Sequence, residues 1–306
     1  MTNPQATLTS NDPILDAFAK EVGDSGPISV QGERTRWEHG GELDDDARVV
    51  HAPSGIVEYK PEEMTITVRA GTTVADLHAH LANAGQRTAL PERGGTVGGA
   101  VAVGENDFRS LGRGRVRESL LQVRYISAEG RIVTSGGPTV KNVSGFDLPR
   151  LICGSLGTLG LIGEVTLRTN PIPATSKWFR CSQVAHQAVF DSLLAPSAVL
   201  TNGTDTWVQL EGHQIDVDAE TAVLANLADT HEVAGPPQFP QHRWSVSPGG
   251  INSLQSEFIA VVGVGLAFCD QPQPSRSVTP VVADLSAKLK AQFDPRGRLN
   301  PGRKVA

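Results

Sequence analysis

Three separate glycine-rich segments within residues 32–160 constrain the fold of this chain more than any other feature. The first surrounds Gly32, and the others span residues 94–99 and 154–160. Loops of small residues let backbone N–H groups approach phosphate oxygens without an intervening side chain. Only 5% of residues are aromatic, while glycine and proline number 32 and 20, which is typical of a chain with many tight turns. These features favour a nucleotide cofactor held by loops.

Each glycine segment taken alone is equally consistent with ordinary turns and close strand packing, since glycine serves both for conformational reasons. Two common dinucleotide sites are excluded by motif. The sequence has no G-x-G-x-x-G that opens a strand-turn-helix unit and no G-x-x-x-x-G-K-[ST], so neither a Rossmann site nor a P-loop is predicted.

The charge balance argues against a nucleic-acid partner. The 306 residues include 27 basic and 33 acidic side chains, a formal net charge of -6, which would repel phosphates over the molecule as a whole. The N-terminal residues lack the basic and apolar regions of a secretory signal, and no segment approaches the length of a membrane-spanning helix. We therefore expect a soluble cytoplasmic protein, whose only route to the inner membrane is through partners.

No metal site or disulfide framework is predicted. The cysteines lie far apart without C-x-x-C spacing, which argues against a zinc site or an iron–sulfur cluster and favours small buried side chains. They are Cys153, Cys181 and Cys269. The acidic run at residues 44–46 is interpreted as a solvated turn. His78 and His80, two residues apart on a predicted helix, point in different directions and cannot share a metal.

The hydrophobic pattern changes between helical and strand periods along the chain, which predicts an α+β fold. Residues 91–104 contain too much glycine for a regular helix, so an irregular segment is predicted there. Helices are predicted at residues 12–22, 73–84, 184–194, 219–228 and 281–293. Strands are predicted at residues 28–30, 49–52, 56–59, 64–70, 120–127, 131–135, 161–168, 177–181, 198–201, 207–211 and 258–268.

The prolines at positions 171 and 173 mark the best candidate domain boundary,. We expect a first domain over residues 1–174 and a smaller α+β domain, of the ferredoxin-like kind, over residues 175–275. Residues 276–306 are expected to form a C-terminal helix and a turn-rich tail that folds back on the first domain.

Four motifs, taken in order, resemble a known family. A strand runs into the short loop at residues 31–35, P-x-x-x-G-T-V-G-G begins at Pro91, G-F-D-L-x-R-L-x-x-G-S-L-G-T-L-G-L-I begins at Gly145, and F-D-P-x-G-x-L-N-P-G-R begins at Phe293. Together they resemble the FAD-binding (PCMH-type) segments of the vanillyl-alcohol oxidase flavoproteins, and most of all the FAD-binding subunit of bacterial glycolate oxidase. The resemblance covers residues 12–173 and 281–303 and is loose between them.

The resemblance implies a first domain of two α+β halves with FAD stretched between them, and a tail that returns to the flavin. It implies that the first loop contacts the pyrophosphate, with Arg34 as a countercharge, and that the second segment approaches the pyrophosphate and flavin. The third segment would hold the ribityl and adenosine portions, with Asn300 beside the isoalloxazine ring. The implied FAD-binding residues are Gln31, Gly32, Glu33, Arg34, Thr35, Pro91, Gly95, Thr96, Val97, Gly98, Gly99, Gly145, Asp147, Gly154, Ser155, Gly157, Thr158, Gly160, Ile162 and Asn300.

The chain departs from the family's pattern in two respects. Glu33 would repel a pyrophosphate unless its carboxylate points away or pairs with Arg34. Catalytic family members carry a metal-binding H-x-G-D-G-N-x-H stretch that is missing here, and Leu156 stands where they usually carry Glu. His213 and His242 are isolated, so no catalytic residue is assigned.

These departures predict an FAD-binding subunit that passes electrons between a catalytic flavoprotein subunit and an iron–sulfur subunit of a 2-hydroxy acid dehydrogenase. Two alternatives stay open: a self-sufficient FAD-dependent oxidoreductase of a hydroxy acid or alcohol, and a flavin-free structural subunit. The run Arg113, Arg115 and Arg117 fits a carboxylate substrate, a partner's acidic face or a solvated edge equally well. Covalent and non-covalent attachment of FAD also stay open; His39 lies near the first loop.

Overall fold

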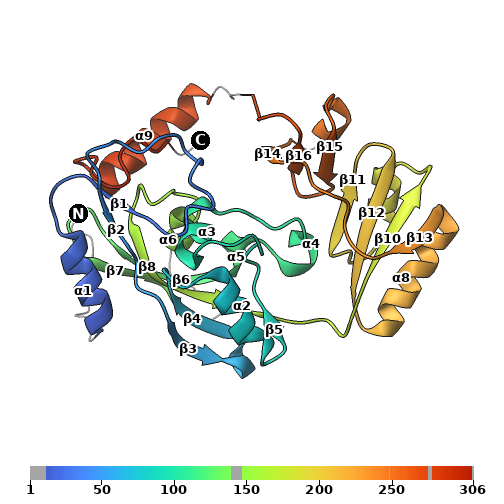
Figure 1. The fold of residues 1–306 in the computed structure, drawn as a ribbon, viewed down its shortest axis with the longest axis horizontal. Coiled ribbons are helices and arrows are strands. Elements are labelled where there is room, and N and C mark those ends of the chain that lie inside the picture. The colour runs from blue at the N-terminus through green and yellow to red at the C-terminus, as the bar shows by residue number, and fades with distance from the viewer. Residues whose placement is uncertain (1–11, 139–146, 248, 275–277, 305–306) are drawn as a thin grey trace. The chain divides into compact units, whose positions relative to one another are not determined.

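The computed structural model describes residues 12–138, 147–247, 249–274 and 278–304, and their helices and strands confirm the predicted α+β class (Figure 1). The chain divides into two compact units. Unit 1 takes its described residues from 1–106, 116–171 and 278–306, and unit 2 takes its own from 107–115 and 172–277. The sequence pattern did not predict that residues 107–115 leave the first unit to join the second.

Unit 1 is built on a five-stranded antiparallel sheet of order β3-β4-β8-β6-β7. The central strand β8 (Leu161–Arg168) has seven of its eight residues buried, as a strand covered on both faces requires. The other strands of this sheet are β3 (Ile56–Lys60), β4 (Thr65–Arg69), β6 (Leu120–Ile126) and β7 (Ile132–Gly136). Two small sheets complete the unit: the parallel pair β1 (Ile28–Val30) and β2 (Arg48–Val50), and the antiparallel pair β5 (Gln86–Arg87) and β9 (Asn170–Pro171).

Helices of unit 1 pack on these sheets. They are α1 (Pro13–Val22), α2 (Val74–Ala82), α3 (Val97–Val103), α5 (Val116–Ser119), α6 (Leu148–Ile152) and α9 (Pro280–Phe293), with a 3-10 turn at Pro61–Glu63. The prediction of an irregular segment at residues 91–104 is wrong in its second half, because α3 is a helix there. Thr96 caps α3 by accepting from the amide of Gly99 at 3.2 Å, and the Cβ that a side chain would add at Gly98 would lie 2.7 Å from the Cβ of Ala70. Close packing on β4 therefore outweighs the low helix propensity of glycine.

The C-terminal tail lies against the start of unit 1. Leu299 forms a parallel bridge with Ile28 of β1, and Asp294, buried at the end of α9, accepts from the amides of Arg298 and Leu299. The guanidinium of Arg298 donates to five backbone carbonyls at 2.9–3.0 Å, which lie on Val22, Gly23, Ser25, Gly26 and Ala128.

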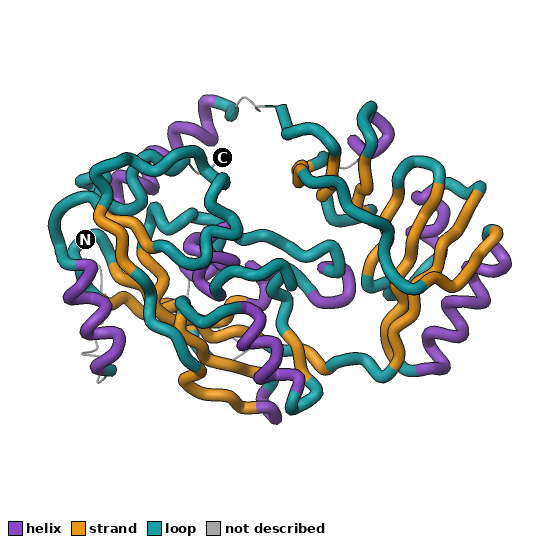
Figure 2. Tube along the Cα trace, in the orientation of Figure 1, coloured by secondary structure: helices purple, strands orange, loops and turns teal. Residues whose placement is uncertain are grey.

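Unit 2 contains a ferredoxin-like core, as predicted. Its elements β10 (Thr175–Ser182), α7 (His186–Ser192), β11 (Ala198–Thr201), β12 (Asp205–Gly212), α8 (Gln214–Leu227) and β13 (Asp229–Val233) follow the order β-α-β-β-α-β,. The four strands pair in the order β13-β10-β12-β11, and α8 packs along them (Figure 2). The sheet continues through β15 (Phe258–Val261), β16 (Leu266–Cys269) and β14 (His242–Ser245), and the unit also holds the short helices α4 (Ser110–Arg113) and Gly250–Ser253.

Candidate functional site

Two adjoining cavities lie in unit 1, where the first loop, α3 and the C-terminal tail meet. The larger has a volume of about 340 Å³, within the range of small-molecule sites, and the smaller about 110 Å³,. They share lining residues, so they form one continuous site. The shared residues are Val30, Gly32, Glu33, Thr96, Gly99, Ala102 and Asn300.

The loop that follows β1 presents free backbone donors to both cavities. The N–H groups of residues 32–35 donate to no group in the described part of the chain. Arg34 adopts a left-handed conformation with φ of 58°, which turns the successive amides inward. Consecutive unpaired amides of this kind form an anion-binding concavity, so the loop suits a phosphate group.

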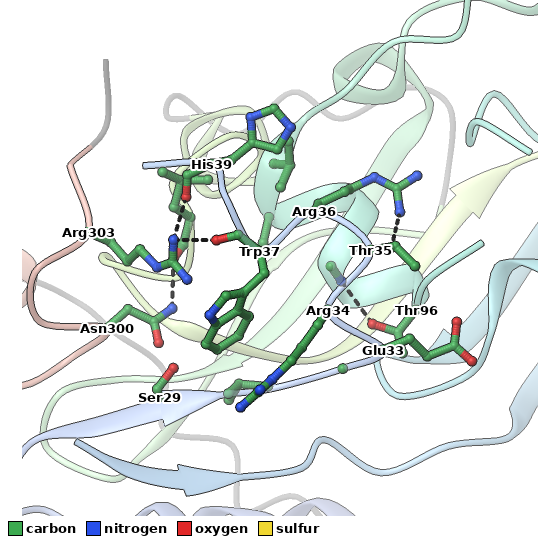
Figure 3. A pocket seen from close by; sticks show the side chains of 16 residues that line it. Ser29, Glu33, Arg34, Thr35, Arg36, Trp37, His39, Thr96, Asn300 and Arg303 are labelled. Atoms are coloured by element: carbon green, nitrogen blue, oxygen red, sulfur yellow. Dashed lines mark hydrogen bonds between the residues drawn. The ribbon is translucent and has the colours of Figure 1, made fainter. Parts of the chain in front are cut away.

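The side chain of Glu33 points away from these amides, toward the second glycine segment (Figure 3). Its carboxylate accepts from the backbone N–H of Gly95 at 2.8 Å. Arg34 instead donates to the side-chain oxygen of Gln31 at 2.6 Å and lies over the ring of Trp37. The carboxylate of Glu33 therefore avoids repelling a bound anion because it points away from the loop amides, and not because it pairs with Arg34.

The glycines of the first two segments permit close backbone approach. A Cβ at Gly32 would lie 2.6 Å from the Oγ1 of Thr96, and a Cβ at Gly95 would lie 2.4 Å from the Oγ1 of Thr35. Neither position has room for a side chain. The first loop can therefore lie directly against residues 94–99 only because both are glycine.

The third segment meets the C-terminal tail at the cavity wall. The side-chain amide of Asn300 donates to the carbonyl of Leu156 at 2.6 Å. A Cβ at Gly157 would lie 2.3 Å from the Nδ2 of Asn300. The Oδ1 of Asn300 is buried and has no hydrogen-bond partner in the described part of the chain. A buried acceptor without a partner is costly, and a donor group on a bound ligand would satisfy it.

Eleven of the predicted FAD-binding residues line one or both cavities. They are Gln31, Gly32, Glu33, Arg34, Thr35, Thr96, Gly98, Gly99, Gly157, Ile162 and Asn300. The structure places eight others elsewhere, and Gly145 lies outside the described residues. The eight are Pro91, Gly95, Val97, Asp147, Gly154, Ser155, Thr158 and Gly160.

Several of the eight have structural roles instead. Asp147 caps α6 by accepting from the amide of Arg150 at 3.2 Å. Thr158 donates to the carbonyl of Ser155 at 2.7 Å within a turn. A Cβ at Gly160 would collide with the ring of Tyr125. The motif therefore combines residues that face the cavity with residues that shape the turn behind it.

The cavity residues that were not predicted to bind FAD include Arg36, Trp37, His39 and Arg303. Arg303 donates to the backbone carbonyls of Trp37, His39 and Gly41, and its guanidinium lies 4.7 Å from the ring centre of Trp37 (Figure 3). Burial lowers the pKa of Arg303, partly offset by Glu38. Arg303 is the final residue of the C-terminal motif, so that motif was the one sequence signal that could have identified it as a cavity residue.

Within the described ranges, no three His, Cys, Asp or Glu side chains cluster in a way that could hold a metal ion. No helix there is long and apolar enough to cross a membrane. The three cysteines are free and buried, as predicted.

Comparisons with known proteins agree with this site. Residues 10–136 match the family model "FAD binding domain". Glycolate oxidase subunit GlcE of Escherichia coli is 29% identical over 96% of this chain and 97% of its own length. Glycolate oxidase subunit GlcD of Bacillus subtilis is 31% identical, but the match covers 40% of this chain and 27% of that protein. A D-lactate dehydrogenase of Archaeoglobus fulgidus is 42% identical over 25% of this chain and 17% of its own length.

Solved structures share the fold. An alkyldihydroxyacetonephosphate synthase superposes with a TM-score of 0.69 at 14% identity, over 94% of this chain and 74% of its own. BBE-like 1 of Physcomitrella patens superposes with a TM-score of 0.59 at 16% identity, over 95% of this chain and 88% of its own. This chain is thus similar to an FAD binding domain over residues 10–136 and to a glycolate oxidase subunit over nearly its whole length, and it shares its fold with the solved structures.

Proposed function

We propose that this chain is the FAD-binding, electron-transferring subunit of a complex that oxidises a small 2-hydroxy acid. The observation that carries the proposal is the end-to-end match to a protein named as a glycolate oxidase subunit, over 96% of this chain and 97% of that one. The second and third relatives match over 40% and 25% of this chain. The first match therefore spans both units.

The cavity residues fit FAD and suggest how the chain would hold it. The free amides of residues 32–35 would bind the pyrophosphate, and the buried Oδ1 of Asn300 would accept from a donor on the ligand. Ile162 and Gly157 would line the nucleotide end of the larger cavity. When bound, FAD supplies a centre that accepts electrons from one partner and passes them to another.

The side chains around the cavities suggest electron transfer without substrate chemistry in this chain. Oxidation of a hydroxy acid needs a cation for the carboxylate and a base for the hydroxyl proton. The carboxylate of Glu33 accepts from the backbone of Gly95, and the guanidinium of Arg303 donates to three backbone carbonyls. Leu156, which lines the smaller cavity, offers neither function.

A second candidate function is a self-sufficient FAD-dependent oxidoreductase. One observation favours it: His39 lines the smaller cavity, and an imidazole can serve as a general base. The flavin-free structural subunit is disfavoured by the match of residues 10–136 to an FAD binding domain.

Partners follow from the proposal. A catalytic flavoprotein subunit would oxidise the substrate, and an iron–sulfur subunit would take up the electrons, because the three cysteines here are far apart and buried,. Association with the inner membrane would then come through those partners.

Co-expression tests this assignment. The tagged chain is produced alone and together with the glycolate-oxidase-like flavoprotein and iron–sulfur proteins of its source. We expect FAD in both preparations, with glycolate- or D-lactate-dependent dye reduction only in the co-expressed complex. Equal turnover by the chain alone would favour the second candidate, and failure of the three chains to copurify would overturn the proposal.

A further inference from the structure

We propose that Arg36, and not Arg34, is the arginine that positions the pyrophosphate loop (residues 31–36) and gives it positive charge. This inference rests on the assignment of the cavity to FAD and adds a residue that the sequence motif does not contain. Arg36 here is a positioning residue, because it acts through the loop whose amides face the ligand.

The guanidinium of Arg36 ties together segments that are distant in sequence. Its side chain is 4% exposed, and its Nε donates to the carboxylate of Glu105 at 2.6 Å. Its Nη1 donates to the Oγ1 of Thr35 at 3.0 Å and to the carbonyl of Gly94 at 2.9 Å. One side chain thus joins the first loop, the second glycine segment and Glu105, two residues beyond the end of α3.

The remaining nitrogen of Arg36 points to a ligand. The Nη2 is buried and has no hydrogen-bond partner in the described part of the chain, although Arg36 lines the smaller cavity beside the free amides of residues 32–35. A buried cation with an unused donor is costly unless an anion lies nearby. The pyrophosphate of FAD is such an anion.

Arg36 is the buried member of the two arginines that contact Glu105. Glu105 accepts from both Arg36 and Arg93, each at 2.6 Å. The side chain of Arg36 is 4% exposed, whereas that of Arg93 is 43% exposed. Solvent therefore screens the charge of Arg36 weakly and that of Arg93 strongly.

Arg34 is less suited to this role. It is exposed, its Nη2 is bonded to Gln31, and its guanidinium lies 4.9 Å from the ring centre of Trp37. Its charge is therefore open to screening by salt. The backbone of Arg34 contributes to the free amides, but its side chain is replaceable.

The packing around Gly95 supports the same inference. A Cβ at this position would lie 2.5 Å from the Nη1 of Arg36, while the amide of Gly95 already donates to Glu33. Residues 94–95 are thus shaped to receive Arg36 from one side and Glu33 from the other. Glycine at position 95 serves the arginine and not the cofactor directly.

The test is the affinity of the full chain, prepared without flavin, for FAD, ADP and riboflavin. ADP carries the adenosine and the diphosphate without the flavin, and riboflavin carries the flavin without any phosphate. We expect Arg36→Gln to weaken FAD and ADP binding by roughly 10- to 100-fold, as loss of a charge-assisted contact does, and to leave riboflavin binding unchanged. The matched variants Arg34→Gln and Arg93→Gln should change ADP affinity less than about 3-fold.

Arg36→Lys separates charge from geometry and guards against misfolding of the first variant. It should keep the salt dependence of ADP binding while losing roughly 3- to 10-fold in affinity, because an ammonium is a compact point charge that lacks the planar fork of donors of a guanidinium. Arg36 variants that fold and bind ADP like the wild type, or an equal loss with Arg34→Gln, would overturn the inference. A wild-type chain that binds no FAD would instead overturn the proposed function.

Discussion

The side-chain amide of Asn300 donates to the carbonyl oxygen of Leu156 over 2.6 Å, joining residues 144 positions apart. Leu156 lies in the third glycine segment with a left-handed φ of 53°, and its own amide donates to the carbonyl of Ala102 at the end of α3. These two hydrogen bonds therefore connect the C-terminal tail, the third glycine segment and helix α3. A cofactor site assembled from such distant segments forms only after unit 1 has folded.

Gly157→Ala should break the contact between the tail and the third segment. Gly157 has a φ of 70°, and an added Cβ would lie 2.3 Å from the Nδ2 of Asn300. We expect FAD affinity to fall by at least about 10-fold, measured by flavin fluorescence titration. Gly85→Ala is the control, since Gly85 has a φ of 65° and open space around it. Alanine at this position introduces about 1 kcal/mol of backbone strain without any steric clash. Equal FAD affinities for the two variants would rule out the steric explanation.

Arg298→Met should loosen the anchorage of α1. The side chain donates to five carbonyls around the end of that helix, and leaving buried carbonyls unsatisfied costs about 1–3 kcal/mol. We expect faster hydrogen exchange in the last turn of α1 and the loop to Gly26. The exposed neighbour Arg296→Met serves as control. If hydrogen exchange in α1 were as slow in Arg298→Met as in the wild type, Arg298 would not anchor this helix.

Unit 2 should lose stability in acid through Asp205. The hydrogen bond from Arg180 lowers the pKa of Asp205 below its ordinary value of 3.8, against burial, with help from Ser182. The folded-state pKa is depressed, so this stabilisation is present above about pH 4 and is lost as the pH falls through the folded-state value. Urea unfolding of Asp205→Asn and wild type at pH 3 and pH 6 should show a smaller pH effect in the variant. A parallel pH dependence would exclude this pair as the cause.

His39→Asn distinguishes the two candidate functions. If His39 is only a wall of the smaller cavity, substrate-dependent dye reduction by the complex should change less than about 3-fold. A general base removed from a catalytic site typically costs 100- to 10,000-fold. A loss of that size with FAD still bound would support the self-sufficient oxidoreductase. The same variant also shows whether His39 attaches the flavin covalently, since acid precipitation would then release FAD from the variant but not from the wild type.

The sequence predicted much of the fold and about half of the site, for physical reasons. An alternating apolar pattern predicted the strand β8, and glycine-rich segments pointed to residues 31–35 and 96–99, because both are local signals. The helix α3 was missed because it packs closely against Ala70, which directly follows β4, and this contact is not visible in the local sequence. Arg36 was missed because its partner Glu105 is 69 residues away. Likewise, the sequence did not indicate that Asp147 lies against Arg150 or that Gly160 lies against Tyr125.

Anaerobic mixing of the isolated, FAD-loaded chain with glycolate or D-lactate tests the central claim most directly. Flavin absorbance near 450 nm reports reduction of the bound FAD. If the chain is an electron-transferring subunit, the absorbance should stay constant with substrate alone and fall once the catalytic flavoprotein partner is added. Bleaching of the isolated chain by substrate, at the rate seen in the complex, would contradict the claim and make this chain the site of substrate oxidation.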